Sequence, residues 1–77
     1  MKEILETIIN SLISEDAEAI VTEVVNSDRE IKLEVRVNSE NMGRVIGRNG
    51  RIAKSIRTLM RAIATKENKK VVIEFVD

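Results

Sequence analysis

Cysteine, histidine, tryptophan, tyrosine and proline are all absent from this chain of 77 residues, and phenylalanine occurs once. Without cysteine the chain has no disulfide framework, and without cysteine or histidine it cannot assemble the usual zinc sites. There is also no histidine base, no cysteine nucleophile and no G-x-x-x-x-G-K-[ST] phosphate loop. The composition therefore argues against an enzyme, and we expect no cofactor, no metal and no small-molecule substrate.

Long hydrophobic runs are absent too. No segment approaches the ~20 apolar residues of a membrane span, and the first residues lack the cationic start and apolar run of a signal peptide. The length fits one domain over residues 1–77, near the lower size at which a core suffices without disulfides or metals. We expect a cytoplasmic protein that does not associate with membranes.

The first half of the chain predicts a helix followed by two strands. Residues 2–13 carry apolar side chains at helical spacing, and residues 14–18 read as a polar connection. Residues 19–25 are rich in β-branched side chains, which favours a strand. Residues 31–37 alternate apolar and polar side chains and predict a second strand, paired with the first as a hairpin around a turn at 26–29, with its polar face solvated.

The second half predicts two helices and a last strand. Ser39 is the expected N-cap of a short helix over 40–46 that Gly47 ends, and a second helix is expected from 51 to 65. Residues 67–69 form a turn before a strand over 71–76, in which Phe75 alternates with Val71 and Ile73 and is expected in the core. The element order is therefore α-β-β-α-α-β.

Two glycines three residues apart, Gly47 and Gly50, lie between the predicted helices. Glycine tolerates positive φ, and consecutive amides exposed in such a turn can face an anion. Gly50 also precedes a helix, whose amino-terminal N–H groups and dipole favour a phosphate. The alternative is a plain turn in which one glycine ends a helix and the next opens another.

Charge is strongly segregated although the chain is neutral overall. Residues 1–43 carry ten acidic and four basic side chains, whereas residues 44–70 carry nine basic and one acidic. This asymmetry indicates an anionic partner, and the alternative is the solvated face of an ordinary helix. On a helical projection the basic stripe lies opposite the expected core positions. The stripe consists of Arg51, Lys54, Arg57 and Arg61, and the core positions are Ile52, Ile56, Leu59 and Ile63.

The basic stripe begins beside the two glycines, which favours the anion-binding interpretation. Arg48 and Arg51 are the candidate phosphate contacts, with Lys54 one turn further along. Arg57 and Arg61 are expected to contribute to the electrostatic field more than to direct contact.

The string Val-Ile-Gly-Arg-Asn-Gly-Arg-Ile at 45–52 follows Asn-Met-Gly-Arg at 41–44 and precedes the basic amphipathic helix. It resembles the core of a KH domain, and nearly the whole chain resembles the small single-KH bacterial RNA-binding proteins of the KhpA type. The resemblance implies an α+β fold, a single type II-like KH domain with a three-stranded sheet covered by three helices.

The resemblance also implies that the glycine loop, residues 47–50, grips the backbone of about four nucleotides of single-stranded RNA. The bases would lie in a groove between the paired helices and a sheet edge. The residues expected to bind RNA are Gly47, Arg48, Asn49, Gly50, Arg51, Lys54, Arg44, Val45, Ile46 and Ile52.

The apolar candidates leave alternatives open. Either Val45 or Ile46 faces a base while the other packs inward, Ile52 or Ala53 lines the same wall, and each has plain core packing as its alternative. Without tyrosine or tryptophan, binding would rest on phosphates and dispersion, and so be weak and modestly selective.

The resemblance further implies a homodimer, or a heterodimer with a larger KH-containing protein, within a ribonucleoprotein complex that serves post-transcriptional or cell-growth regulation. The alternative function is a protein-interaction module with little or no nucleic-acid binding.

Overall fold

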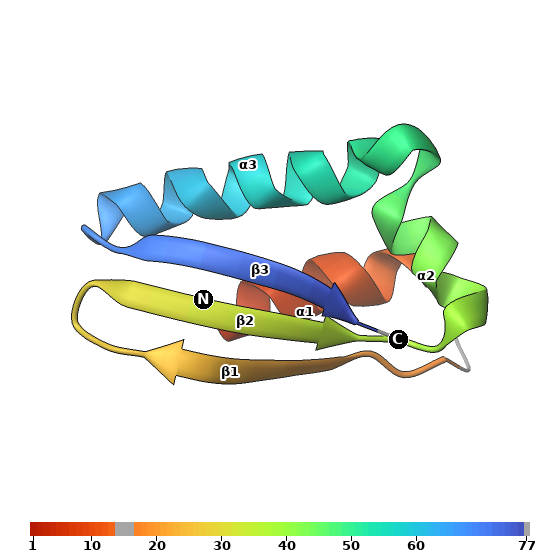
Figure 1. The fold of residues 1–77 in the computed structure, drawn as a ribbon, viewed down its shortest axis with the longest axis horizontal. Coiled ribbons are helices and arrows are strands. Elements are labelled where there is room, and N and C mark those ends of the chain that lie inside the picture. Colours follow the sequence, from red (N-terminus) through yellow and green to blue (C-terminus); the bar gives the residue numbers. More distant parts are fainter. Residues whose placement is uncertain (14–16, 77) are drawn as a thin grey trace.

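The computed structural model describes residues 1–13 and 17–76 of the chain. The predicted α-β-β-α-α-β order is confirmed (Figure 1). The elements are α1 (Lys2–Leu12), β1 (Ile20–Asn26), β2 (Glu30–Arg36), α2 (Ser39–Ile46), the short 3-10 turn η1 (Arg48–Gly50), α3 (Arg51–Lys66) and β3 (Lys70–Val76). Residues 14–16 of the expected polar connection lie outside the described residues.

The three strands form one sheet in the order β1-β2-β3, so β2 is central. β1 and β2 pair antiparallel as the predicted hairpin, with Glu23 opposite Leu33. β2 and β3 pair parallel, with Leu33 opposite Ile73. Parallel neighbours require a long crossover, and here α2, η1 and α3 together supply it. The crossover places the glycine loop at its midpoint, beyond one end of the sheet (Figure 1).

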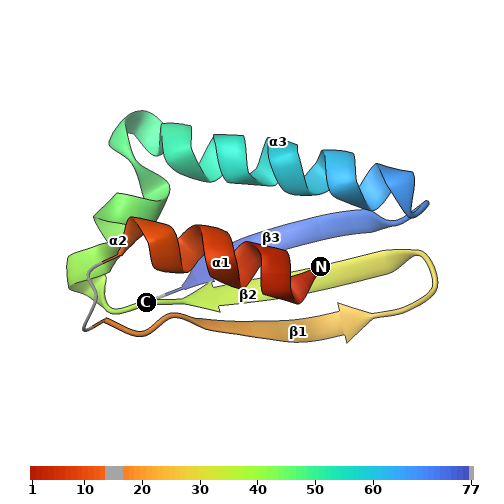
Figure 2. The same ribbon diagram turned by 180° about the vertical axis from the view of Figure 1, so that it is seen from behind.

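All three helices lie on one side of the sheet. Figure 2 shows α1 in front of the sheet and α3 running along β3. The alternation predicted for residues 31–37 is confirmed, because its four apolar side chains are buried against the helices. The core cluster comprises Leu5, Ile9, Ile13, Val21, Ile31, Leu33, Val35, Val37, Val45, Ile56, Met60, Ala64, Val71 and Ile73.

The start of α2 differs from the prediction, because the N-cap is Asn38 and not Ser39. The N–H groups of Asn41 and Met42 donate to the Asn38 carbonyl oxygen at 3.0 and 3.1 Å. The buried Asn41 side chain also donates from Nδ2 to Asn38 Oδ1 at 2.8 Å. This pairing makes Asn38 the last residue before the helix, so Ser39 becomes the first helical residue.

The buried face of α3 also differs from the prediction, because Leu59 is 49% exposed. The buried residues are Ala53, Ile56, Met60 and Ala64. At 100° per residue, this face is rotated by about 75° from the predicted one. The two alanines explain the difference, since small side chains let the helix lie close to its neighbours while contributing little to a hydrophobic pattern. The rotation moves Arg57 to the border of the buried face.

Candidate functional site

Gly47 ends α2 and begins the glycine loop. Its N–H donates to the Gly43 carbonyl oxygen at 2.9 Å, and its φ of 78° and ψ of 174° place it in a region that essentially only glycine adopts. A Cβ at this position would lie 2.6 Å from Cγ1 of Ile52. Both the backbone conformation and the close approach of Ile52 therefore require glycine here.

The rest of the glycine loop forms one tight turn. Asn49 has φ 58° and ψ 27°, and Gly50 has φ 72° and ψ 15°, so both adopt the left-handed conformation. Asparagine is among the few residues besides glycine that adopt it readily. The Gly50 N–H closes the turn by donating to the Gly47 carbonyl oxygen at 3.2 Å. The turn leaves the side chains of Arg48 and Asn49 exposed at its tip.

The amino-terminal end of α3 follows the glycine loop directly. Gly50 is its N-cap, and no side chain of the described residues caps this end of the helix with a hydrogen bond. Without a side-chain cap, the positive end of the helix dipole is not offset by a hydrogen-bonded carboxylate or hydroxyl from residues 1–13 and 17–76. Arg51 stands exposed in the first helical turn, so backbone and side chain together present positive charge at one point. This arrangement suits a phosphate group.

Four basic side chains around the glycine loop are exposed and form no ion pair with an acidic side chain that the structure describes. Within residues 1–13 and 17–76, the three ion pairs are Met1–Glu3, Lys32–Glu74 and Arg36–Glu34. None of these pairs involves the four residues, which are Arg44, Arg48, Arg51 and Lys54. Their charge is therefore uncompensated by direct contact with a carboxylate of the described chain, which raises the local positive potential.

The structure separates the apolar candidates by burial. Val45 is fully buried and Ala53 is 2% exposed, so neither side chain is accessible to a ligand. Ile46 and Ile52 are half-buried and pack at the margin of the core. Between Val45 and Ile46, Ile46 is therefore the residue with accessible surface beside the glycine loop, and Val45 supports the loop from within the core. Between Ile52 and Ala53, the accessible residue is Ile52.

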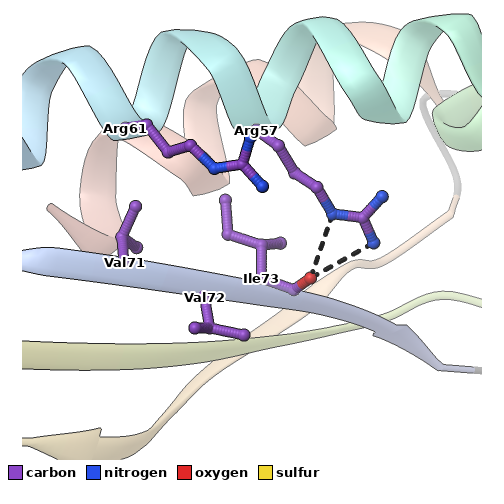
Figure 3. Close-up of a pocket in the computed structure, with 5 residues that line it drawn as sticks. All are labelled: Arg57, Arg61, Val71, Val72 and Ile73. Atoms are coloured by element: carbon purple, nitrogen blue, oxygen red, sulfur yellow. Dashed lines mark hydrogen bonds between the residues drawn. The ribbon is translucent and has the colours of Figure 1, made fainter.

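A small hollow between α3 and β3, called here the β3 groove, lies further along α3 from the glycine loop. It is lined by Arg57, Arg61, Val71, Val72 and Ile73 (Figure 3). Arg57 donates from Nε and Nη2 to the Ile73 carbonyl oxygen at 3.3 and 3.2 Å. Its guanidinium carbon also lies 5.1 Å from the ring centroid of Phe75, within the range of a cation–π interaction.

Sequence reasoning missed this contact of Arg57, because it placed Arg57 on a stripe opposite the core. The rotated buried face of α3 instead turns Arg57 toward β3, where it is half-buried. On the helical projection Arg57 lies at one edge of the basic stripe and Arg51 at the other, so the sequence could indicate that one of them borders the core. Which of the two edges faces the sheet depends on how α3 packs. Phe75 was expected in the core, and the structure instead places it half-buried at the margin of the core cluster, with Arg57 over its ring.

A model of the KhpA/KhpB KH domain matches residues 2–75. The chain belongs to this KH-domain family. The KH domain is 50% identical over 76 residues to "RNA-binding protein KhpA" of Clostridium perfringens, a match that covers 99% of this chain and 100% of the relative. It is 51% identical over 76 residues to the protein of the same name from Clostridium acetobutylicum, with the same two coverages.

A more distant relative of the same name, from Listeria monocytogenes, is 36% identical over 77 residues, with all of both chains covered. No solved structure matches this KH domain. In the part of the chain that the structure describes, no helix is long and apolar enough to cross a membrane. The same residues contain no group of three or more acidic side chains placed to hold a metal ion.

Proposed function

We propose that this KH domain is a noncatalytic protein that binds short single-stranded RNA, about four nucleotides long, through its glycine loop. One observation carries the proposal: three residues with positive φ, Gly47, Asn49 and Gly50, shape a turn that lies among basic side chains with no acidic partner in the described chain. The relatives named "RNA-binding protein KhpA" support the choice of ligand.

In this proposal the RNA backbone lies against the glycine loop. Arg48 and Arg51 contact phosphates directly, and Arg44 and Lys54 extend the positive surface to either side. Ile46 and Ile52 offer dispersion contacts to the sugar or base next to the loop. The single phenylalanine already packs at the core margin, so aromatic stacking contributes little and we expect weak, modestly selective binding. We also propose that this binding takes place in the cytoplasm.

The test is fluorescence anisotropy with a labelled seven-nucleotide RNA at two salt concentrations. The loop variant is Arg48→Asp with Asn49→Asp, since aspartate tolerates both an exposed turn and the left-handed conformation. The control variant, Arg29→Asp with Asn26→Asp, makes the same change of charge at the β1–β2 hairpin, which lies at the opposite end of the molecule (Figure 1). Circular dichroism establishes that each variant is folded.

We expect salt-sensitive binding by the natural protein and the hairpin variant, and none by the loop variant. Equal weakening in both variants would mean that net charge, and not the glycine loop, determines binding. If no protein binds RNA at either salt concentration, the proposed function is wrong and the protein-interaction alternative takes its place.

A second function, self-association, is favoured by the outer face of α3. This face, formed by Lys54, Ser55, Thr58, Leu59 and Ala62, has a shallow and mainly apolar hollow in which Leu59 is 49% exposed. We propose that two copies pack through it, which would join two weak RNA sites and increase avidity. A larger KH-containing protein is the alternative partner.

Light scattering after size-exclusion chromatography tests self-association. Leu59→Lys should shift a dimer to a monomer, whereas Val24→Lys should not. Val24 is a matched control because it is 51% exposed on the edge strand β1. A monomeric natural protein, or an effect of equal size from both variants, would argue against this face.

A further inference from the structure

Of the asparagines in the chain, only Asn49 precedes a glycine. A glycine has no Cβ to shield its backbone nitrogen, so this nitrogen can approach the side-chain amide carbon of a preceding asparagine closely. Attack of the nitrogen on that carbon is the first step of asparagine deamidation, which needs no enzyme. Asn49 is exposed at the tip of the glycine loop, so the reacting groups and water can meet there.

The Asn49 side chain is free to move, unlike other asparagine side chains of this protein. No hydrogen bond to a residue that the structure describes holds it. By contrast, Asn26 donates from Nδ2 to Glu23 Oε2 at 3.0 Å, and Asn41 donates from Nδ2 to Asn38 Oδ1 at 2.8 Å. The space beside Gly50 is also open, because a Cβ built there would meet no atom within 4 Å.

One weak turn separates the two reacting atoms. At a ψ of 27° for Asn49, the Gly50 nitrogen is turned away from the Asn49 side chain. The Gly50 N–H donates to the Gly47 carbonyl oxygen at 3.2 Å, at the long end of the range for such bonds. Single turns at exposed loop tips open at low free-energy cost, and opening lets ψ rotate toward the geometry of attack.

Asn68 is a comparison within the same chain. It is exposed and has a similar left-handed φ of 56°. The next nitrogen, that of Lys69, carries a full side chain on its Cα and donates to the Ala64 carbonyl oxygen at 2.9 Å. The nitrogen that would attack Asn68 is therefore both shielded and more firmly held than the one that follows Asn49.

We propose that Asn49 is a site of spontaneous deamidation that converts the glycine loop to a form with weakened phosphate binding. The Gly50 nitrogen bonds to Asn49 Cγ, the Cγ–Nδ2 bond breaks, and ammonia leaves with the Gly50 proton, which closes a succinimide ring. Water then opens the ring to aspartate, or to isoaspartate, in which the chain continues through the side-chain carboxyl. Both products carry a carboxylate at the loop tip, and the net reaction is hydrolysis of the amide.

The new carboxylate would act against the site in two ways. It lies next to the start of α3, which has no side-chain cap among the described residues, and the helix dipole favours a negative charge there. It also lies between Arg48 and Arg51 in the sequence and lowers their positive potential. The expected effect on RNA rests on the proposed function, whereas the modification itself does not.

The first experiment incubates the natural protein in mildly alkaline buffer, in which the attacking nitrogen loses its proton more readily. Mass spectrometry of the intact chain with fragmentation follows the conversion of each asparagine over time. We expect Asn49 to convert at least about tenfold faster than Asn68, because the Lys69 side chain shields its nitrogen. Equal rates at the two asparagines would overturn the proposal without any measurement of RNA binding.

The second experiment measures RNA affinity by anisotropy before and after incubation, with circular dichroism as the test of folding. The converted natural protein should stay folded and bind about tenfold more weakly, since a carboxylate replaces a neutral amide beside two phosphate contacts. Asn49→Gly suits positive φ but has no side-chain amide, so its affinity should not fall from its own starting value. An equal fall in Asn49→Gly, or unchanged affinity of the converted natural protein, would overturn the proposal.

Failure of this inference is separable from failure of the proposed function. If fresh protein binds RNA with salt sensitivity while Asn49 does not convert, the glycine-loop function stands and the deamidation inference is wrong. If Asn49 converts but fresh protein binds no RNA, the proposed function is wrong, and so is the weakening of phosphate binding that rests on it.

Discussion

The basic side chains on the sheet form ion pairs within the protein, whereas those around the glycine loop form none with the described residues. On the sheet, Lys32 Nζ lies 3.1 Å from Glu74 Oε1, and Arg36 Nη2 lies 3.2 Å from Glu34 Oε1. Around the glycine loop, Arg48 and its basic neighbours have no acidic partner among the described residues. The equal numbers of acidic and basic residues in the chain therefore conceal a positive surface around the glycine loop, which is offset by the excess of acidic residues in residues 1–43.

The pairing on the sheet has a local cause. Glu34 and Glu74 are direct neighbours in the parallel register of β2 and β3, and like charges in such positions repel. Lys32 and Arg36 each lie next to one of these carboxylates and offset the repulsion. The sheet cations thus stabilise the protein itself, while those of the glycine loop contribute nothing comparable and remain available to an external anion.

The largest effect is expected when the glycine loop is distorted while every charge is left in place. Gly47→Ala should lower the free energy of unfolding by about 3 kcal/mol, because alanine is strained at this φ and ψ and its Cβ would overlap Ile52. Urea denaturation followed by circular dichroism measures the change.

Two other glycines are controls for Gly47→Ala. Gly50→Ala meets no atom within 4 Å but adopts positive φ, so it should cost about 1 kcal/mol. Gly43→Ala, inside α2 with equally open space, should stabilise by about 0.5–1 kcal/mol. Equal effects at Gly47 and Gly43 would show that the loop geometry described here is wrong.

Removing two cations from the glycine loop should weaken RNA binding, whereas removing two from the sheet should not. Arg48→Ala with Arg51→Ala should weaken binding at least tenfold near 0.1 M salt, because two phosphate contacts are lost. The slope of log K against log salt should change from roughly −2 to roughly −0.7, because Arg48, Arg51 and Lys54 together would neutralise about three phosphates and Lys54 alone about one. Anisotropy titrations at several salt concentrations give both values.

Lys32→Ala with Arg36→Ala is the matched double variant on the sheet. Its affinity should stay within about twofold and its salt slope should be unchanged, because long-range charge contributes little beyond a Debye length. A similar loss of affinity in both double variants would remove the distinction between the two surfaces.

The smallest expected effect is the change in the free energy of unfolding when a single cation is removed. Lys32→Met should lower the free energy of unfolding by about 0.5 kcal/mol, since the ion pair is partly exposed and Glu34 and Glu74 would then repel each other more strongly. Arg48→Met should leave stability unchanged within that margin. Paired thermal melts would detect a shift of about 2–4 °C for the first variant only.

The order of elements and the position of the glycine loop could be predicted because both depend on local sequence. Alternating Ile31, Leu33 and Val35 mark a half-buried strand, and the glycines at 47 and 50 mark the turn between two helices. The boundary at Asn38 was missed because it depends on the side chain of Asn41, which a single-residue preference for serine at an N-cap does not include.

The face of α3 that meets the sheet could not be predicted from hydropathy. Hydropathy predicts that Leu59 is buried, but the structure buries Ala53 and Ala64 on that face and leaves Leu59 exposed. The same limitation hid the contact between Arg57 and Ile73, which joins residues sixteen positions apart and exists only once α3 lies along β3. Burial likewise separated Val45 from Ile46, two neighbours of similar hydrophobicity that the sequence leaves equivalent.

Titration of the 15N-labelled protein with a short single-stranded RNA, followed by amide chemical shifts, shows whether RNA binds at the glycine loop or on the sheet. The proposed function predicts shifts at residues 47–54, with little change at Lys32, Glu34 and Glu74 on the open face of the sheet. Shifts centred on the sheet face, with the glycine loop unaffected, would contradict it.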